Sequence, residues 1–390
     1  MKQIYRHALL TLLLGATCAT AEATTGDIIN EDFSGFTGIT YATTSKNGWT
    51  LNRCSIVNNS SYCGLKFDDE NNGKSSATTP KLSSLTETCN AVMTFRYANT
   101  ANNKNASFSV TIKGGGTFPN GKKEWTTTIT TGSQVFNDGT LKLVGVSAAS
   151  SVTFKLTSTN SGFFALDDVV ISTADQVVLS ESAPNVLETK VADVTVGRTI
   201  QGGVWNTLCL PFNAGKNTIA QATGNAVEDV SLRTFSGFSN NELTFAEKDT
   251  ITAGTPFLIK VTKTSANPVF TLASLKGDAT AKTVTYNGAS MAGTLAPTNI
   301  GTTGLFLTAG GELKRAASGS TTLKGLRAYF TVPAGTLQAR LMLDDGATVI
   351  DMVEAVAADG RWYAPDGRRY NTQPTRQGIY IKDGKKIIIR

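Results

Sequence analysis

Proton transfer near neutral pH is the chemistry that the side-chain inventory limits most. The chain of 390 residues has one histidine, His7, and it lies in a predicted leader, Met1–Ala21. Cleavage of that leader would leave no imidazole. Ser-His-Asp and Cys-His hydrolases, HExxH zinc enzymes and histidine general-acid catalysis are then excluded, because each needs a histidine base or ligand. Carboxylate, lysine or tyrosine chemistry remains possible, as does the absence of catalysis.

Paired carboxylates are the catalytic groups that this composition still allows. Glycoside hydrolysis needs two carboxyl groups about 5–9.5 Å apart in a cleft, one of them with a raised pKa. Adjacent acids occur at Asp68, Asp69 and Glu70 and again at Asp344 and Asp345. Both groups lie beside Gly or Asn residues, as solvated turns do, so we expect no catalytic residues among them.

The first 21 residues have the parts of a secretory signal peptide. Lys2 and Arg6 precede the apolar run Ala8–Leu14, and the small residues Ala19–Ala21 follow it as a cleavage site. Acylation of Cys18 is a disfavoured alternative to simple cleavage. No later stretch reaches the ~18 consecutive apolar residues of a membrane-spanning helix. We therefore predict an exported protein, at the cell surface or extracellular, without a transmembrane helix.

Four cysteines follow the leader. In an oxidising compartment, the short separation between Cys54 and Cys63 suits a disulfide that would contribute roughly 2–3 kcal/mol. Cys89 could pair with either one, because sequence alone does not determine connectivity. Cys209 lies in the apolar string Leu208–Leu210, which favours a buried free thiol. The spacing and the lack of histidine argue against zinc.

The apolar stretches indicate which elements would position these groups. Most are short, rich in Val, Ile, Thr, Phe or Tyr, and bounded by Gly, Asn, Asp or Ser, as in Ser107–Lys113 and Thr140–Val146. Helical periodicity is confined to Asn217–Ala222 and Asp351–Ala358. We predict an all-β protein with an N-terminal jelly-roll sandwich, a second β-sandwich and a small C-terminal antiparallel sheet. The predicted boundaries are 1–21 signal peptide, 22–172 binding domain, 173–187 linker, 188–348 second domain and 349–390 C-terminal domain.

Short motifs in the first predicted domain occur in a suggestive order. Glu31–Phe36 reads EDFSGF, Trp49 and Thr79–Leu82 follow, and Phe164–Ile171 reads FALDDVVI. This order resembles the jelly-roll domains of carbohydrate-binding modules and related adhesion domains. In that family the first and last strands are adjacent, and their acidic side chains often hold a structural Ca²⁺, an ion that takes about 6–8 oxygen ligands. The resemblance implies four metal ligands: Glu31, Asp32, Asp167 and Asp168.

The metal prediction carries a geometric condition. Consecutive strand residues point to opposite faces, so Asp167 and Asp168 can reach one ion only if the strand has a bulge. The alternative is that one aspartate faces solvent and the other caps a turn.

Sugar binding on such a fold needs aromatic rings against which the apolar face of a sugar stacks. Phe163 is one available ring, and we predict ligand contacts for five others: Tyr41, Trp49, Tyr62, Tyr97 and Trp125. A core position is the alternative for both tryptophans, and it is favoured for Trp49.

The remaining sequence contains two further resemblances. Val204–Asn213, Ala253–Val261, Met291–Thr298 and Leu326–Val332 resemble segments of surface proteins of Gram-negative gut and oral anaerobes. The tail Trp362–Arg390 resembles sorting domains of type IX (Por) secretion, with matching positions at Gly367-Arg368, Gly378-Ile379-Tyr380 and Lys385-Lys386-Ile387. The resemblance implies the export machinery as a partner. A terminal hairpin that closes the preceding sandwich is the alternative.

The formal charge of +6 is concentrated at the C-terminus. The tail from Arg361 to Arg390 has eight basic and two acidic residues. Its net charge therefore equals that of the whole chain. No broad basic face remains for a phosphate backbone, so we expect no nucleic-acid partner.

Together these observations predict a non-enzymatic, exported cell-surface protein. Its jelly roll would bind glycan or another ligand on a host or neighbouring cell. The alternatives are a carboxylate-dependent glycoside hydrolase or lyase, and a structural stalk or matrix protein.

Overall fold

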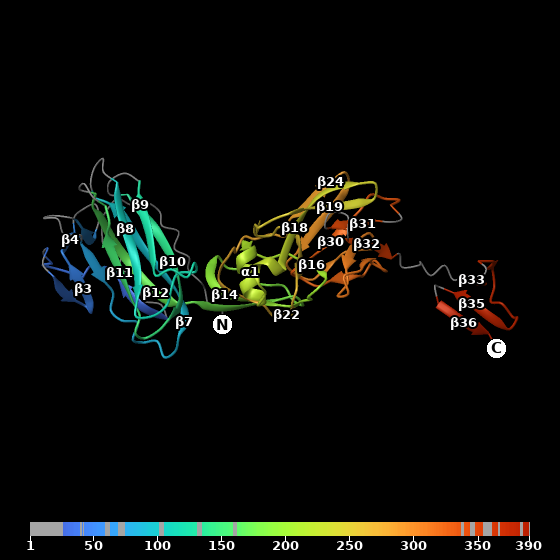
Figure 1. The fold of residues 1–390 in the computed structure, drawn as a ribbon, viewed down its shortest axis with the longest axis horizontal. Helices are drawn as coiled ribbons and strands as arrows, with labels where there is room; N and C mark the ends of the chain where they lie inside the picture. The colour runs from blue at the N-terminus through green and yellow to red at the C-terminus, as the bar shows by residue number, and fades with distance from the viewer. Residues whose placement is uncertain are drawn as a thin grey trace, which may run out of the picture. The chain divides into compact units, whose positions relative to one another are not determined.

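A computed structural model describes the chain from residue 26 to residue 389 (Figure 1). It omits residues 40, 42, 59–62, 69–74, 101–104, 131–134, 159–161, 337–338, 344–347, 354–360, 366 and 383–384. The chain divides into two units, which meet in sequence between Ala174 and Asp175. The predicted signal peptide and the acid pair Asp344 and Asp345 lie outside the described residues. The fold is all-β, as the short strand-like segments predicted.

The first unit is a sandwich of two six-stranded sheets. One sheet has the order β10-β7-β12-β5-β4, with β1 also paired to β12, and the other has the order β2-β3-β6-β11-β8-β9. The strands are β1 Asp27–Glu31, β2 Thr44–Lys46, β3 Trp49–Asn52, β4 Cys54–Asn58, β5 Cys63–Phe67, β6 Ser76–Thr78, β7 Cys89–Asn99, β8 Ala106–Lys113, β9 Glu124–Ile129, β10 Phe136–Val146, β11 Ser151–Leu156 and β12 Phe164–Thr173.

Strand alternation builds the core of this unit. In β8, Phe108, Val110 and Ile112 point inward and are at most 1% exposed, because alternate residues of a strand face the same side. Phe108 stacks on Phe164 of the facing sheet, with ring centroids 4.5 Å apart. Each such side chain contributes roughly 1.5–3 kcal/mol by burial, so the rings hold the two sheets together.

The predicted Cys54–Cys63 disulfide is wrong. The two cysteines lie at opposite ends of the β4–β5 hairpin, where Cys54 pairs with Phe67 and Cys63 pairs with Asn58. Four positions along the ladder separate them by roughly 13 Å, whereas a disulfide needs Cα atoms within about 7 Å. Cys54 is a buried free thiol, and its Sγ lies 3.4 Å from the carbonyl oxygen of Ser76.

The second unit contains most of the remaining strands and the helix α1, Lys216–Thr223. An eleven-stranded sheet has the order β16-β21-β18-β19-β31-β32-β28-β27-β30-β25-β24. It folds over itself, so that Phe245 of β19 contacts Phe330 of β30 with centroids 6.0 Å apart. A second core forms where β13, β14 and β23 make a three-stranded sheet and α1 packs against β23.

The element bounds of this unit follow in chain order. They are β13 Asp175–Ser180, β14 Lys190–Gly197, β15 Thr199–Ile200, β16 Trp205–Leu208, β17 Ala214–Gly215, α1 Lys216–Thr223, the 3-10 helix η2 Val227–Asp229, β18 Val230–Ser239, β19 Glu242–Glu247, β20 Thr250–Ile251, β21 Phe257–Val261, β22 Ser265–Ala266, β23 Val269–Leu275, β24 Thr283–Tyr286, β25 Ala289–Thr294, β26 Thr298–Asn299, β27 Leu305–Leu307, β28 Leu313–Arg315, β29 Thr322–Leu323, β30 Arg327–Thr331, β31 Arg340–Leu343, β32 Thr348–Val353, β33 Trp362–Tyr363, β34 Arg369–Tyr370, β35 Gly378–Lys382 and β36 Lys385–Ile389.

Three sequence predictions change in this unit. The predicted linker, 173–187, contains β13, which pairs in parallel with β14, so the second unit already begins at Asp175. The boundary predicted at residue 349 falls within β32, which pairs with β31 and β28. The helix predicted over Asp351–Ala358 is wrong for its first three residues, which belong to β32, and its remainder lies outside the described residues. The helix predicted at Asn217–Ala222 is confirmed as α1.

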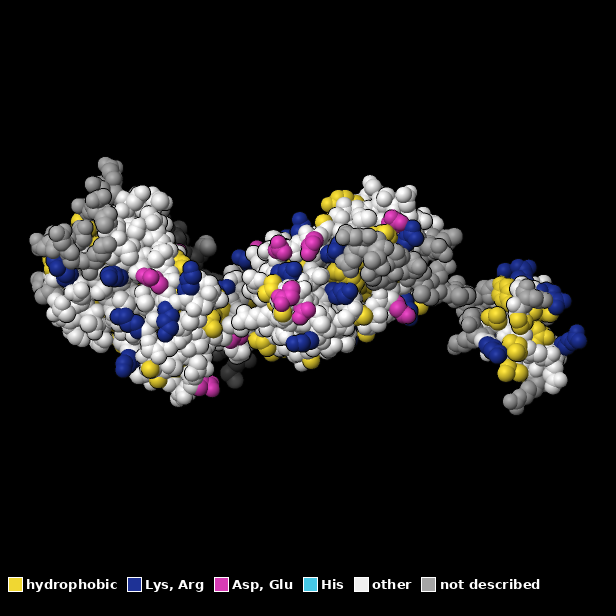
Figure 2. Space-filling model, in the orientation of Figure 1, with side chains coloured by type: hydrophobic (Ala, Val, Ile, Leu, Met, Phe, Trp, Pro, Cys, Tyr) yellow, Lys and Arg dark blue, Asp and Glu magenta, His cyan; other side chains and the backbone are white. Residues whose placement is uncertain are grey.

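The chain ends in a four-stranded antiparallel sheet of order β34-β33-β35-β36. Trp362 and Tyr380 pack edge to face with centroids 6.4 Å apart, while Ile379, Ile381 and Ile388 stay exposed. Figure 2 shows hydrophobic side chains bordered by Lys and Arg on this sheet. Among the described residues, the structure contains no helix of the length and apolarity that a bilayer crossing requires.

Candidate functional site

Strands β5 and β1 both pair with the same edge of β12, and acidic residues lie where the two pairings adjoin. Leu166 of β12 pairs with β5, and Val169 pairs with Glu31 at the end of β1. Between these pairings β12 bulges: Asp167 lies opposite Arg96 of β7, the next pairing begins at Val170, and Asp168 has φ of 47°. The bulge that the metal prediction required is therefore present.

The four predicted metal ligands lie at this junction, but each already has a partner of its own. Glu31 Oε1 accepts a hydrogen bond from the backbone N–H of Phe33 at 2.9 Å, and Asp32 Oδ1 accepts one from Ser34 at 2.9 Å. Asp167 Oδ1 accepts the N–H of Asp168 at 3.0 Å. The remaining carboxylate, Asp168, forms an ion pair with Arg96 Nη1 at 3.2 Å.

The electrostatics of the junction single out Asp167. This side chain is 8% exposed. Burial, then the neighbouring charge of Asp168, raises the pKa of Asp167 to about 7, and Asp32 adds to the effect. Burial also raises the pKa of Glu31. The junction therefore concentrates more negative charge than the single guanidinium of Arg96 offsets.

This arrangement does not fit a calcium ion. Among the described residues, no group of three or more His, Cys, Asp and Glu side chains could hold a metal ion. Ca²⁺ needs several oxygens converging at about 2.3–2.6 Å, and the junction carboxylates are turned to separate donors instead. Calcium therefore stays a prediction from the resemblance alone, and we derive no role for it.

Arg96 and Phe136 are functional candidates that the sequence did not reveal. They lie on the outer face of the sheet, and the guanidinium carbon of Arg96 lies 4.6 Å from the centroid of the Phe136 ring. Asp168 approaches the same guanidinium. These residues are far apart in sequence and meet only through the β10-β7-β12 strand order, so no local signal could have found them.

Trp49 is not a ligand-binding ring. It is 1% exposed and packs on Phe33 with centroids 5.1 Å apart. The alternation of β3 points Trp49 and Leu51 into the core, so its prediction as a ligand contact is wrong and the core alternative holds. Tyr41 is 38% exposed, and Tyr62 lies outside the described residues.

Tyr97 and Trp125 are the two predicted rings that the structure brings together. Tyr97 belongs to β7 and Trp125 to β9, so they come from opposite sheets. Both pack edge-on against Phe108, with centroids 5.3 Å and 6.0 Å away respectively. Each ring is only partly buried at the margin of the core. Packing therefore holds both rings in place while part of each stays accessible.

The structure describes only Asp68 of the first group of acids considered for catalysis. Asp68 was expected in a solvated turn, but it is 1% exposed and its Oδ2 lies 3.5 Å from Lys66 Nζ. Lys66 Nζ also lies 5.1 Å from the ring centroid of Phe163. Asp69 and Glu70 lie outside the described residues.

Comparisons with known proteins do not assign a family. No family model matches the chain, and no curated protein matches it. Among solved structures, the K3 cleaved adhesin domain of Lys-gingipain from Porphyromonas gingivalis W83 has 20% identity and a TM-score of 0.27, covering 37% of this chain and 98% of that chain.

Two carbohydrate-binding modules also match. The CBM22-2 xylan-binding domain of Paenibacillus barcinonensis Xyn10C has 10% identity and a TM-score of 0.27, covering 38% of this chain and 99% of that chain. The family 11 module of Clostridium thermocellum Lic26A-Cel5E has 16% identity and a TM-score of 0.24, covering 39% of this chain and 97% of that chain. Identities and TM-scores at this level assign no function to the chain.

Proposed function

We propose that this chain is a non-enzymatic, exported binding protein whose first unit binds glycan at the margin formed by Tyr97 and Trp125. One observation carries the proposal: rings from the two facing sheets meet on Phe108 and remain partly exposed. An aromatic ring held by packing offers a sugar an apolar face without a further loss of side-chain freedom on binding.

The polar surroundings favour a hydroxylated ligand over an apolar one. Thr127 lies two positions after Trp125 and is half-buried on the same face of β9, because alternate residues of a strand share a face. A hydroxyl group beside a ring supplies hydrogen bonds that orient a sugar. Binding at a site with two partly buried rings is expected to be weak for a single sugar unit.

A glycan-array screen of the chain, repeated with Trp125→Ala and Tyr97→Ala, tests the proposal. We expect each substitution to weaken binding about tenfold, since ring contacts of this kind contribute roughly 0.5–1.5 kcal/mol beyond area burial. Tyr286→Ala is the matched control, because this exposed tyrosine belongs to the second unit. Circular dichroism checks that each variant folds.

Three results would contradict the proposal. Equal binding by the wild type and both ring variants would remove Tyr97 and Trp125 from the site, and no binding to any glycan would favour a structural stalk. Release of reducing sugar from a bound oligosaccharide would instead support the carboxylate-dependent hydrolase.

We further propose that the C-terminal sheet serves export to the cell surface. Its support is the separate sheet β33–β36, with exposed isoleucines next to basic residues. Mass spectrometry of the secreted protein tests whether Arg390 remains. Export that is undiminished after deletion of residues 361–390 would contradict this role.

A further inference from the structure

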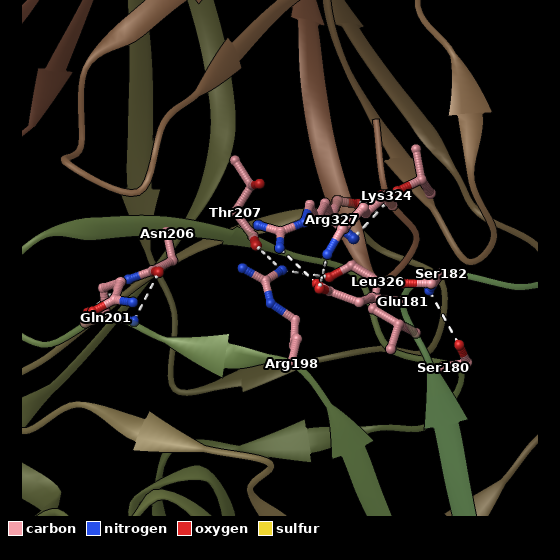
Figure 3. Close-up of polar contacts among 11 residues, drawn as sticks. Ser180, Glu181, Ser182, Arg198, Gln201, Asn206, Thr207, Lys324, Leu326 and Arg327 are labelled. Carbon is pink, nitrogen blue, oxygen red and sulfur yellow. Dashed lines mark hydrogen bonds and ion pairs between the residues drawn. The ribbon is translucent and has the colours of Figure 1, made fainter. Parts of the chain in front are cut away.

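A polar cavity of about 150 Å³ lies within the second unit. Its lining includes Glu181 and Arg198 from the first part of the unit and Arg327 from a distant segment, together with Gln201 and Thr308. Figure 3 shows the guanidinium of Arg198 directed toward Thr207, Leu326 and Glu181. A cavity of this volume can hold one six-membered ring, as an engineered cavity of about 150 Å³ holds benzene.

Arg198 is buried but incompletely hydrogen-bonded. It is 3% exposed, and its Nη1 donates to the carbonyl oxygens of Thr207 at 2.8 Å and Leu326 at 2.7 Å. Its buried Nε has no hydrogen-bond partner in the described part of the structure. Within the described part of the chain, both hydrogen bonds of the guanidinium come from Nη1, so the edge formed by Nε and Nη2 has no protein acceptor. That edge is the fork to which a carboxylate binds bidentately.

The charges around the cavity favour an anionic ligand. Glu181 is the one carboxylate among the described lining residues, and Arg327 Nη2 and Lys324 Nζ each lie 2.6 Å from one of its oxygens. Glu181 is therefore shared by two cations, and no carboxylate of the described residues forms an ion pair with Arg198. Among the described lining residues, two arginines stand against one glutamate, so the local charge is positive.

The ionisation of Arg198 agrees with this count. Burial, followed by repulsion from Arg327, lowers the pKa of Arg198 to about 9. The guanidinium still carries its charge at neutral pH. A buried cation with an unpaired donor is costly in free energy, and an acceptor brought by a ligand would remove that cost.

The rest of the lining selects among carboxylates. Thr199, Gln201 and Thr308 supply hydroxyl and amide groups, and the lining residues that the structure describes include no aromatic ring. The Asn206 amide is already used, since it exchanges hydrogen bonds with the backbone of Gln201. Hydroxyl and amide groups suit a ligand that carries hydroxyls as well as a carboxylate.

We propose that this cavity binds the carboxylate of a uronic acid, with Arg198 as the bidentate anchor and Gln201 and Thr308 as partners for the ring hydroxyls. This site is separate from the one proposed for the first unit and does not depend on it.

Calorimetric titration of the full chain with glucuronate, glucose and acetate at millimolar concentrations tests the proposal. We expect glucuronate to bind at least tenfold more tightly than glucose, which has the same ring without the carboxylate, and than acetate, which has only the carboxylate. A peptide with a free C-terminus serves as the alternative source of a carboxylate.

Two variants separate a loss of binding from a loss of folding. Arg198→Gln should weaken glucuronate binding at least tenfold, but it also removes two structural hydrogen bonds. Glu181→Gln removes the competing carboxylate and frees Arg327 and Lys324, so we expect affinity to rise severalfold, which misfolding cannot produce. Glu242→Gln is the matched control, because it removes an equally short ion pair, to Arg340 at 2.6 Å, outside the cavity.

Equal affinity for glucuronate and glucose, or weaker binding by Glu181→Gln, would overturn the proposal. Binding of acetate or of the free-terminus peptide as tight as that of glucuronate would overturn the assignment to a uronic acid.

Discussion

Replacing Asp167 by Asn should make the first unit more stable at neutral and alkaline pH, although it alters a buried residue. Asparagine keeps an oxygen that can accept the N–H of Asp168, the bond that Asp167 Oδ1 accepts at 3.0 Å. It does not carry the charge that burial and Asp168 disfavour. The substitution therefore removes an unfavourable ionisation and conserves the local hydrogen bond.

The pKa of Asp167 gives the size and the sign of the effect. The folded unit holds the proton up to about pH 7, whereas the unfolded chain releases it near 3.8. The folded state binds more protons than the unfolded state in that pH window. The contribution of protonated Asp167 to the stability of the first unit is therefore fully present below pH 3.8 and is lost as pH rises to about 7. At about 1.4 kcal/mol per pH unit, the wild type loses roughly 4 kcal/mol of unfolding free energy over this pH range, and the asparagine variant does not.

The assay is urea unfolding of the full chain at pH values from 4 to 8, read by a pulse of hydrogen exchange at one fixed labelling pH. Peptides from β7 and β12 report the first unit alone. Glu124→Gln is the control, because Glu124 is an exposed carboxylate in the same unit. A variant with unchanged pH dependence, or with lower stability than the wild type at pH 8, would refute the reasoning.

The same experiment with added calcium tests the metal prediction. A bound Ca²⁺ would hold Asp167 ionised and stabilise the wild type at pH 8, and the ion would have less effect on Asp167→Asn. From the separate engagement of the four carboxylates we expect no calcium-dependent shift in either protein.

Three further predictions concern the packing of the first unit. Trp49→Ala should cost roughly 3–5 kcal/mol of unfolding free energy in urea titrations, because it empties a core position; a cost below 1 kcal/mol would contradict that position. Gly114→Ala should destabilise more than Gly121→Ala in the same assay, because both glycines have positive φ but only a Cβ at Gly114 would overlap the carbonyl oxygen of Ala149; equal costs would contradict this. Burial raises the pKa of the Cys54 thiol, so iodoacetamide should leave it unmodified in the folded protein, and a disulfide-linked peptide containing Cys54 in nonreducing mass spectrometry would disprove the free thiol.

Local pattern was sufficient where a property depends on neighbouring residues. Ser107–Lys113 and Thr140–Val146 were predicted as strands and lie in β8 and β10, because alternation of apolar residues reports one buried face. The need for a bulge at Asp167 and Asp168 followed from the same alternation. The eight-residue helix α1 was also visible in its local periodicity.

Pairing between distant strands could not be predicted from local sequence pattern. The short spacing of Cys54 and Cys63 fitted a closed loop and a hairpin equally well, and only the register of β4 on β5 placed the cysteines apart. Residues 173–187 looked like a linker, because a parallel partner such as β14 is not apparent in the segment itself.

By itself, the sequence determined the all-β class, the rings and carboxylates available for binding, and the concentration of positive charge in the tail. Tertiary structure alone decided that Trp49 is buried while Tyr97 and Trp125 meet on Phe108, and that Arg198 lies beside Glu181 with a donor unpaired. The physical reason is that side-chain type and alternation are local properties, whereas burial, charge balance and pKa depend on which strands pair and which sheets pack together.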